Sequence, residues 1–232
     1  MIGQQSTRKQ CSNLSKVARL VDLIVISWAF QYFHVSFKNY ENGFGQSPGT
    51  ESHGGPTFCA IAALHLMGRL EQLTEQERGS IIKWCLQRQS TGFQGRPYKD
   101  PDTCYSFWVG ATLALLNSFK YVNDKQNVDF LDSTQEIMIG GFCKYPNTFP
   151  GKRIHSHKPS VILFANFIML LDILHTFFGI SALSVRVYSE VSQDDDVQSV
   201  FPALNISQRA LNHLKSLHLT WETEQWQCSS QS

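Results

Sequence analysis

A Gly-Phe pair recurs in this chain at a fixed interval. Gly43-Phe44, Gly92-Phe93 and Gly141-Phe142 are each separated from the next by 49 residues. The same interval separates two apolar segments rich in small residues, Thr57–Leu64 and Ser106–Leu113. A period of this length is typical of stacked supersecondary units, none of which can bury its apolar face alone. We therefore predict a repeat architecture.

The repeated units have helical signals. Residues 56–68 carry apolar side chains at helical spacing, with Pro56 near the start and Gly68 at the end, as helix termini prefer. Thr74 and Glu77 form a capping-box pattern ahead of a second helix that extends to residue 89. A third helix is expected over 102–116, with a carboxylate at its N-terminus. These signals predict an all-α fold of helical hairpins joined by Gly-rich turns.

Composition excludes several classes of protein. The chain has 232 residues, a formal net charge of +1 and six cysteines without a CxxC pair. A near-neutral charge argues against binding nucleic acid through bulk electrostatics. The apolar stretches 20–37 and 161–171 are too polar or too short to span a bilayer. We therefore expect a cytoplasmic protein with reduced cysteines, no nucleic-acid partner and no stable membrane insertion.

The third repeat is interrupted. The segment 176–183 resembles the helices that contain Thr57 and Ser106, but Thr176 lies 119 residues after Thr57, where two periods would give 98. The 21 extra residues are assigned to an insertion near 152–171, for which a retained intron is one hypothesis. His155 and His157 lie within it, and an irregular basic segment makes a metal-binding role for this His-x-His pair improbable.

The run Arg96–Trp108 concentrates chemically useful side chains ahead of the third helix. Arg96 and Lys99 are cations that donate charge-assisted hydrogen bonds to phosphate oxygens. Asp102 and Cys104 offer an oxygen and a sulfur, both of which bind zinc. The sequence therefore favours a diphosphate-binding site close to a metal. The alternatives are that Asp102 only caps its helix and that Cys104 is only a small core residue.

The chain contains four ordered motifs, which are Tyr40–Phe44, Glu51–Cys59, Arg96–Trp108 and Asp172–Gly179. Together they resemble the β subunits of protein prenyltransferases, which are α/α-barrels, or toroids, of helical hairpins. The resemblance covers residues 38–151 and 172–221, and it is strongest to the geranylgeranyltransferase type I branch. The stretch 102–112 favours that branch over the Rab-directed enzyme, and Phe178 favours it over farnesyltransferase.

The resemblance implies a role for each motif residue. Asp102, Cys104 and His175 would bind one Zn²⁺ per β subunit, and together with Tyr105 they form the expected catalytic set; Mg²⁺ is not predicted. The substrates would be geranylgeranyl diphosphate and C-terminal CaaX proteins such as small GTPases, and the partner would be a prenyltransferase α subunit. His53, Arg96, Lys99 and Tyr105 would bind the diphosphate group, and Gly54 and Gly55 would let it approach the backbone. Trp108 and Phe178 would line the tunnel for the isoprenoid.

The predicted domain organisation is a divergent segment over 1–37 followed by a toroid domain over 38–232. The family barrel needs about six hairpins, and this chain supplies roughly three and a half of them, so we expect a partial barrel.

An alternative function follows from the missing hairpins and the insertion: a non-catalytic truncated or mis-spliced product that at most binds the α subunit. His53 also has an alternative role as a structural turn residue beside Gly54 and Gly55.

Overall fold

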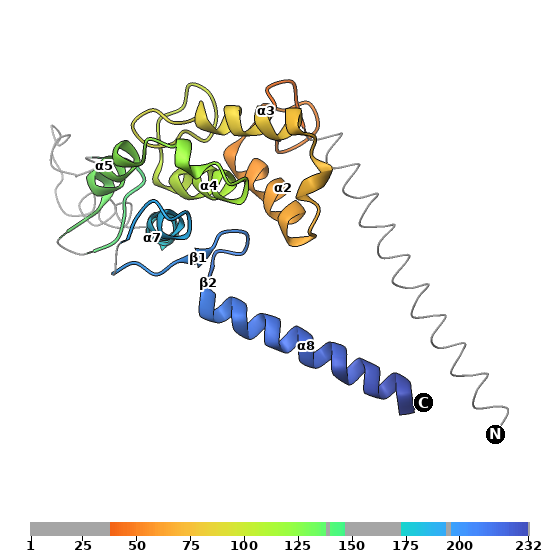
Figure 1. Cartoon of the computed structure of the whole chain (residues 1–232). Helices are drawn as coiled ribbons and strands as arrows, with labels where there is room; N and C mark the ends of the chain where they lie inside the picture. Colours follow the sequence, from red (N-terminus) through yellow and green to blue (C-terminus); the bar gives the residue numbers. More distant parts are fainter. Residues whose placement is uncertain (1–37, 138–139, 147–172, 194–195, 232) are drawn as a thin grey trace, which may run out of the picture. The chain divides into compact units, whose positions relative to one another are not determined.

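The computed structural model describes residues 38–137, 140–146, 173–193 and 196–231 (Figure 1). The chain divides into two compact units, one over residues 37–207 and another that contains helix α8 (Gln208–Gln231). The predictions for segment 1–37, for the insertion near 152–171 and for His155 and His157 lie outside the described residues.

Helices dominate the unit over residues 37–207, as predicted. Two short 3-10 helices, η1 (Leu70–Gln72) and η2 (Phe119–Tyr121), follow α2 and α4. An antiparallel pair of two-residue strands, β1 (Val200–Phe201) and β2 (Ile206–Ser207), precedes α8. The α helices of this unit are α2 (Gly54–Leu66), α3 (Glu75–Leu86), α4 (Thr103–Leu115), α5 (Asp124–Thr134) and α7 (Ile173–Tyr188).

The three helices expected from sequence are confirmed within a few residues. Thr74 and Glu77 form the expected capping box at the start of α3. Asp102 caps α4, because its side chain accepts a hydrogen bond from the amide of Cys104. Helix α2 begins at Gly54, two residues before Pro56, because the side chain of His53 caps it by accepting from the amide of Gly55. Side-chain capping therefore decides where these helices start.

The predicted period is visible in the backbone. Helices α2 and α4 start 49 residues apart, at Gly54 and Thr103, and α7 starts 70 residues later, which is 21 more than one period. The phenylalanine of each Gly-Phe pair is buried and forms an isolated β-bridge: Lys38↔Phe44, Gln89↔Phe93 and Gln135↔Phe142. The amide of Phe44 donates to Thr57 Oγ1 at 3.0 Å, and the amide of Phe142 donates to Thr176 Oγ1 at the same distance. The three units are thus structural repeats.

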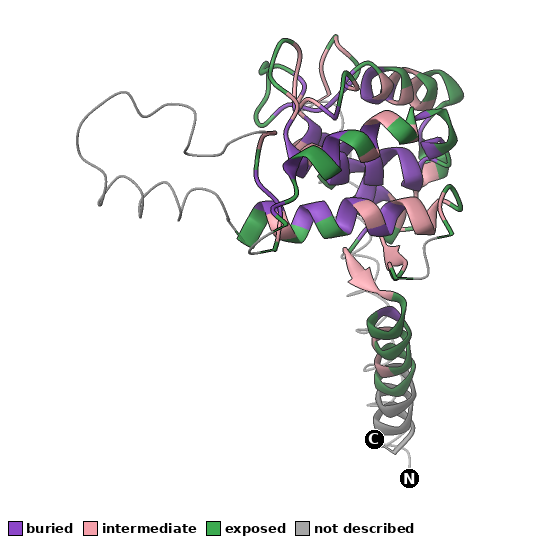
Figure 2. Ribbon diagram, turned by 90° about the vertical axis from the view of Figure 1, so that its left-hand side faces the viewer, coloured by how far each residue is buried: buried purple, intermediate pink, exposed green. Residues whose placement is uncertain are grey.

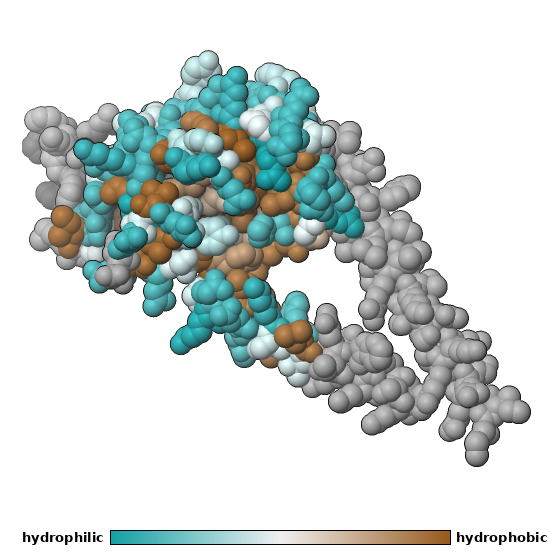
Figure 3. All heavy atoms as spheres, viewed as in Figure 1, coloured by the Kyte–Doolittle hydropathy of each residue, from teal (hydrophilic) through white to brown (hydrophobic). Residues whose placement is uncertain are grey.

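Helix α4 lies between α2 and α7 and contacts both, while α3 and α5 pack against α4 (Figure 1). The buried side chains gather on these packed helices (Figure 2), where Ile61, Leu113 and Val185 are fully buried. On the face visible in Figure 3, polar residues predominate and apolar residues are interspersed among them. The first residues of α4 are therefore held at the centre of the array.

None of the helices in the described ranges is both long enough and apolar enough to cross a bilayer.

Candidate metal centre and anion-binding residues

Asp102, Cys104 and His175 come together at the point where the start of α4 meets the start of α7. Asp102 Oδ1 accepts from the Cys104 amide at 2.9 Å and lies 3.2 Å from His175 Nε2. One ligand atom from each of the three side chains lies within 4.8 Å of the other two. All three residues are buried. The capping role expected for Asp102 as an alternative is therefore compatible with a role in metal binding.

The donor set fits a zinc ion. Zn²⁺ bonds to nitrogen and oxygen are about 2.0–2.2 Å long, so two such ligands in a tetrahedron lie roughly 3.3 Å apart. The distance of 3.2 Å between Asp102 Oδ1 and His175 Nε2 matches that separation. One oxygen, one nitrogen and one sulfur leave the fourth tetrahedral position for a substrate, as catalytic zinc sites do. The three residues thus form a site that could hold a metal ion.

The charges around Asp102 keep its carboxylate ionised. Burial raises the pKa of Asp102, but hydrogen bonds from His175 and from the Cys104 amide outweigh that effect, and the pKa is lowered overall. The two carboxylate oxygens of Asp102 have different partners. Lys144 Nζ lies 3.6 Å from Oδ2, whereas His175 Nε2 lies beside Oδ1. An ionised carboxylate is the form that binds a metal.

Lys144 was missed in the sequence reasoning. It follows the third Gly-Phe pair and lies 49 residues after Gly95, which follows the second pair and contacts Tyr105. Extending the repeat alignment past Phe142 would have placed a lysine at the edge of the candidate site.

His53 and Tyr105 form a second part of the site. His53 Nδ1 accepts a hydrogen bond from the Gly55 amide at 3.2 Å, so the ring proton of the neutral imidazole resides on Nε2. His53 Nε2 lies 3.1 Å from Tyr105 Oη and donates to it, which leaves the phenolic proton for another acceptor. Burial, with help from the positive charge of Arg96, lowers the pKa of His53 and favours this neutral form. Tyr105 is thus oriented as a donor.

The remaining predicted anion-binding residues lie close to this pair or are exposed. Arg96 forms an ion pair with Glu51, and both side chains are partly exposed. Burial raises the pKa of Tyr105, and the charges of Asp102 and Cys104 add to the effect, so the phenol stays protonated. Lys99 lies on the exposed part of the loop before α4. The backbone is close-packed here, since a Cβ on Gly54 would approach Tyr105 Cδ1 to 3.1 Å.

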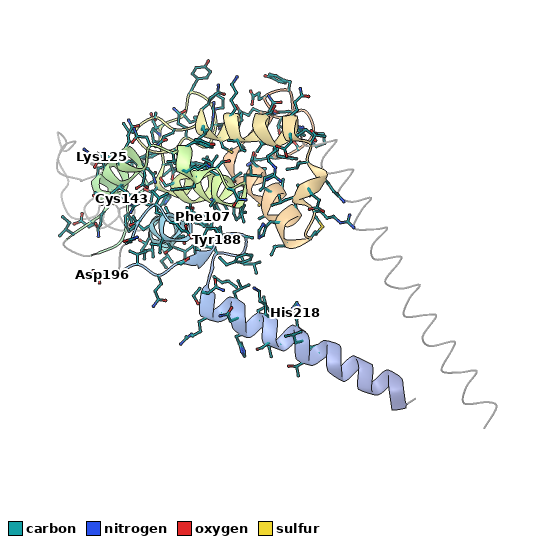
Figure 4. The ribbon with its side chains drawn as sticks, viewed as in Figure 1. Phe107, Lys125, Cys143, Tyr188, Asp196 and His218 are labelled. Atoms are coloured by element: carbon teal, nitrogen blue, oxygen red, sulfur yellow. The ribbon has the colours of Figure 1, made fainter. Side chains whose placement is uncertain are left out.

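Aromatic side chains extend from the candidate metal centre along α4 and α7. The ring centroids of Trp108 and Phe178 are 4.4 Å apart, and Phe107 stacks on Phe178 at 5.3 Å. Phe58 on α2 joins the cluster with its ring centroid 5.0 Å from that of Trp108. Phe107, labelled in Figure 4, is fully buried, whereas Trp108 is half-buried. The cluster is apolar and accessible on the side of Trp108.

A family model, the prenyltransferase alpha-alpha toroid domain, matches residues 7–206 of the chain. The chain belongs to this family. The fold and the resemblance expected from sequence are thereby confirmed, because the matched domain is the helical toroid that the repeat pattern and motifs indicated.

The chain is similar to geranylgeranyl transferase type-1 β subunits. That of Dictyostelium discoideum is 37% identical over 172 residues, which cover 74% of this chain and 41% of the relative. That of Arabidopsis thaliana is 39% identical over 158 residues, covering 64% of this chain and 36% of the relative. A solved structure of Candida albicans protein geranylgeranyltransferase-I complexed with GGPP matches with a TM-score of 0.63 and 27% identity, covering 80% of this chain and 49% of that one. The chain therefore spans less than half the length of each of these proteins.

Proposed function

We propose that this chain provides the catalytic half of a type I protein geranylgeranyltransferase β subunit in the cytoplasm. In this proposal it transfers a geranylgeranyl group from geranylgeranyl diphosphate to the cysteine of a C-terminal CaaX protein. The observation that carries the proposal is the convergence of Asp102, Cys104 and His175, with ligand atoms within 4.8 Å of one another. Family membership and the similarity to type-1 β subunits support it.

Zinc is the metal that suits this donor set, and when bound it would stabilise the thiolate of the incoming substrate cysteine near neutral pH. Asp102, Cys104 and His175 would hold the ion. The ionised Asp102 and the buried setting of all three side chains favour binding of a dication. Mg²⁺ has no part in the proposal.

The diphosphate would be bound by the donors beside the metal site. Tyr105 presents its phenolic proton, and Arg96 and Lys99 add charge at the exposed edge. Lys144 adds an ammonium group 3.6 Å from Asp102 Oδ2. Negative charge grows on the diphosphate as its bond to the isoprenoid carbon breaks, and these donors would stabilise that charge.

The aromatic cluster would bind the apolar isoprenoid. Phe107 and Phe178 are buried and fix the position of Trp108, whose partly exposed ring is free to contact the lipid. Apolar surface of this kind lowers the free energy of a bound hydrocarbon chain by roughly 25 cal/mol per Å² buried. A CaaX protein, for example a small GTPase, and a prenyltransferase α subunit are the proposed partners.

The test is the zinc content of the chain copurified with a prenyltransferase α subunit, followed by an assay of transfer to a CaaX peptide. We expect one zinc per heterodimer. The zinc should be lost in His175→Ala and retained in His65→Ala, because His65 lies in the last turn of α2 and is not one of the three candidate ligands. Transfer should be abolished in the first variant and kept in the second. A folded heterodimer that holds no zinc would overturn the proposal.

A further inference from the structure

Thr103 is a buried residue between the two candidate metal ligands of α4. Its hydroxyl donates to the carbonyl oxygen of Cys143 at 2.6 Å, and Thr134 Oγ1 lies 3.2 Å away from it. Its amide donates to the carbonyl oxygen of Lys144 at 3.2 Å. The side chain has no exposed surface. Thr103 thus connects the start of α4 to the end of α5 and to the loop that carries Lys144.

Comparison with the preceding repeat shows which of these bonds is special. Gly54 occupies the same position at the start of α2, and its amide donates to the carbonyl of Gly95 at 2.8 Å. This bond is the counterpart of the one from the Thr103 amide to Lys144. The glycine has no side chain, so of these two repeats the one with Thr103 alone has a bond from a hydroxyl to the next loop. A general need of the fold would apply to both repeats.

The added bond bears on the placement of Lys144. The side chain of Lys144 is 48% exposed and has a long flexible stem, so a fixed backbone below it limits how far its ammonium group can move from Asp102. Thr103 binds two consecutive backbone carbonyls, that of Cys143 through its hydroxyl and that of Lys144 through its amide, so it holds the backbone on both sides of the Lys144 Cα. Cys143 lies in the loop between α5 and α7, as labelled in Figure 4. Thr103 also follows Asp102 directly in the chain, and the Asp102 carboxylate lies beside the Lys144 ammonium group.

We propose that Thr103 is a positioning residue that fixes Lys144 against the carboxylate of Asp102. The inference rests on the proposed function for the catalytic importance of Lys144, but the positioning itself is a property of the free protein. Losing the hydroxyl would remove its hydrogen bond to the Cys143 carbonyl and would loosen the loop.

The first test is hydrogen–deuterium exchange of the full chain. Thr103→Ala should speed exchange of the backbone amides of residues 143–145 by roughly tenfold, and Thr103→Ser should restore the parent rate because it keeps the hydroxyl. The matched control is Thr112→Ala, which removes an equally buried hydroxyl of α4 that bonds only to Trp108 of the same helix. Equal exchange of 143–145 in the parent and Thr103→Ala would overturn the proposal.

The second test is a double-mutant cycle on prenyl transfer by the heterodimer. Thr103→Ala should lower kcat about tenfold in the parent and leave it unchanged in a Lys144→Ala background, because its effect passes through Lys144. An undiminished effect in that background would overturn the positioning role while leaving the proposed function intact. If the parent transfers nothing, the proposed function fails instead, and the exchange experiment still decides whether Thr103 positions the loop.

Discussion

Gly95 shows at the scale of single residues how closely the backbone approaches Tyr105. A Cβ at this position would lie 2.2 Å from Tyr105 Cζ and 2.6 Å from its Oη. Gly95→Ala should therefore displace the phenol, with a cost of about 1–3 kcal/mol in the free energy of unfolding. It should also weaken binding of geranylgeranyl diphosphate. Urea unfolding and a fluorescence titration with the lipid measure the two effects.

A matched glycine of α3 provides the control. A Cβ on Gly79 would contact nothing within 4 Å, and the residue lies exposed in the helix. Gly79→Ala should stabilise the chain by about 0.5–1 kcal/mol and leave lipid binding unchanged. Equal effects of the two substitutions would mean that contact with Tyr105 is unimportant.

Tyr98 is strained without an evident packing reason. It is fully exposed and has a φ of 61°, in the left-handed region that asparagine and glycine adopt more easily. Tyr98→Asn should raise the free energy of unfolding by roughly 1 kcal/mol, with no loss of buried contacts. Thermal unfolding measures the gain, and the exposed Tyr121, at an ordinary backbone position, serves as the control in Tyr121→Asn. A lower melting temperature for Tyr98→Asn would contradict the argument.

The candidate site residues expected from sequence stand in recognisable motifs. Asp102 and Cys104 are two residues apart, so their pattern is visible in one window, and His175 was expected from the resemblance. Lys144 and Thr103 were not expected, because their roles depend on how the third Gly-Phe loop packs on the start of α4. The repeat alignment indicates which segments meet, but it does not show which side chains form hydrogen bonds there.

At the scale of elements, the capping box of α3 also receives an ion pair. Lys38 donates to Glu77 at 2.8 Å, and this bond, together with those from Thr74, lowers the pKa of Glu77 to about 2. A carboxyl group whose folded pKa is depressed stabilises the folded state above its unfolded pKa, about 4.5, and loses that contribution as the pH falls towards 2. Lys38→Met should therefore lower stability at pH 7 by about 0.5–1 kcal/mol.

The measurement is urea unfolding of the parent and Lys38→Met between pH 7 and pH 3. The difference between them should shrink as the pH falls below about 4.5, because the unfolded carboxyl group becomes protonated there. Lys83→Met, on the same helix, is the matched control and should give a small difference that does not change with pH. A Lys38→Met difference that stayed constant down to pH 3 would exclude the ion pair as its cause.

Helix positions were predictable because capping residues and periodicity are local signals. Residues 74–89 and 102–116 gave α3 and α4 with errors of one to three residues at their ends. The predicted start of α2 was two residues late, because proline is a stronger sequence signal for a helix start than the histidine that caps this helix. The strands β1 and β2 were not anticipated, since two residues in each carry no alternation to detect.

At the scale of the whole molecule, the candidate metal centre joins two repeats. Asp102 and Cys104 belong to the start of α4, while His175 belongs to α7. The ligands are therefore separated in sequence by the stretch that contains the predicted insertion. An ion bound by all three would link the second and third repeats and would stabilise the folded chain by an amount that grows with the logarithm of its affinity.

Zinc should thus raise the melting temperature of the chain, and a chelator should lower it. At a free zinc concentration of about 100 times Kd the gain is roughly 2.7 kcal/mol in the free energy of unfolding, provided that the unfolded chain does not bind the ion. His175→Ala should abolish the zinc-dependent shift because the ligand from α7 is lost. Cys59→Ser, which changes an exposed cysteine of α2 outside the ligand set, should retain it. The same zinc-dependent shift in His175→Ala and in the parent would mean that zinc binds at another site. Loss of the shift in His175→Ala but not in Cys59→Ser would mean that the ion binds residues of both α4 and α7.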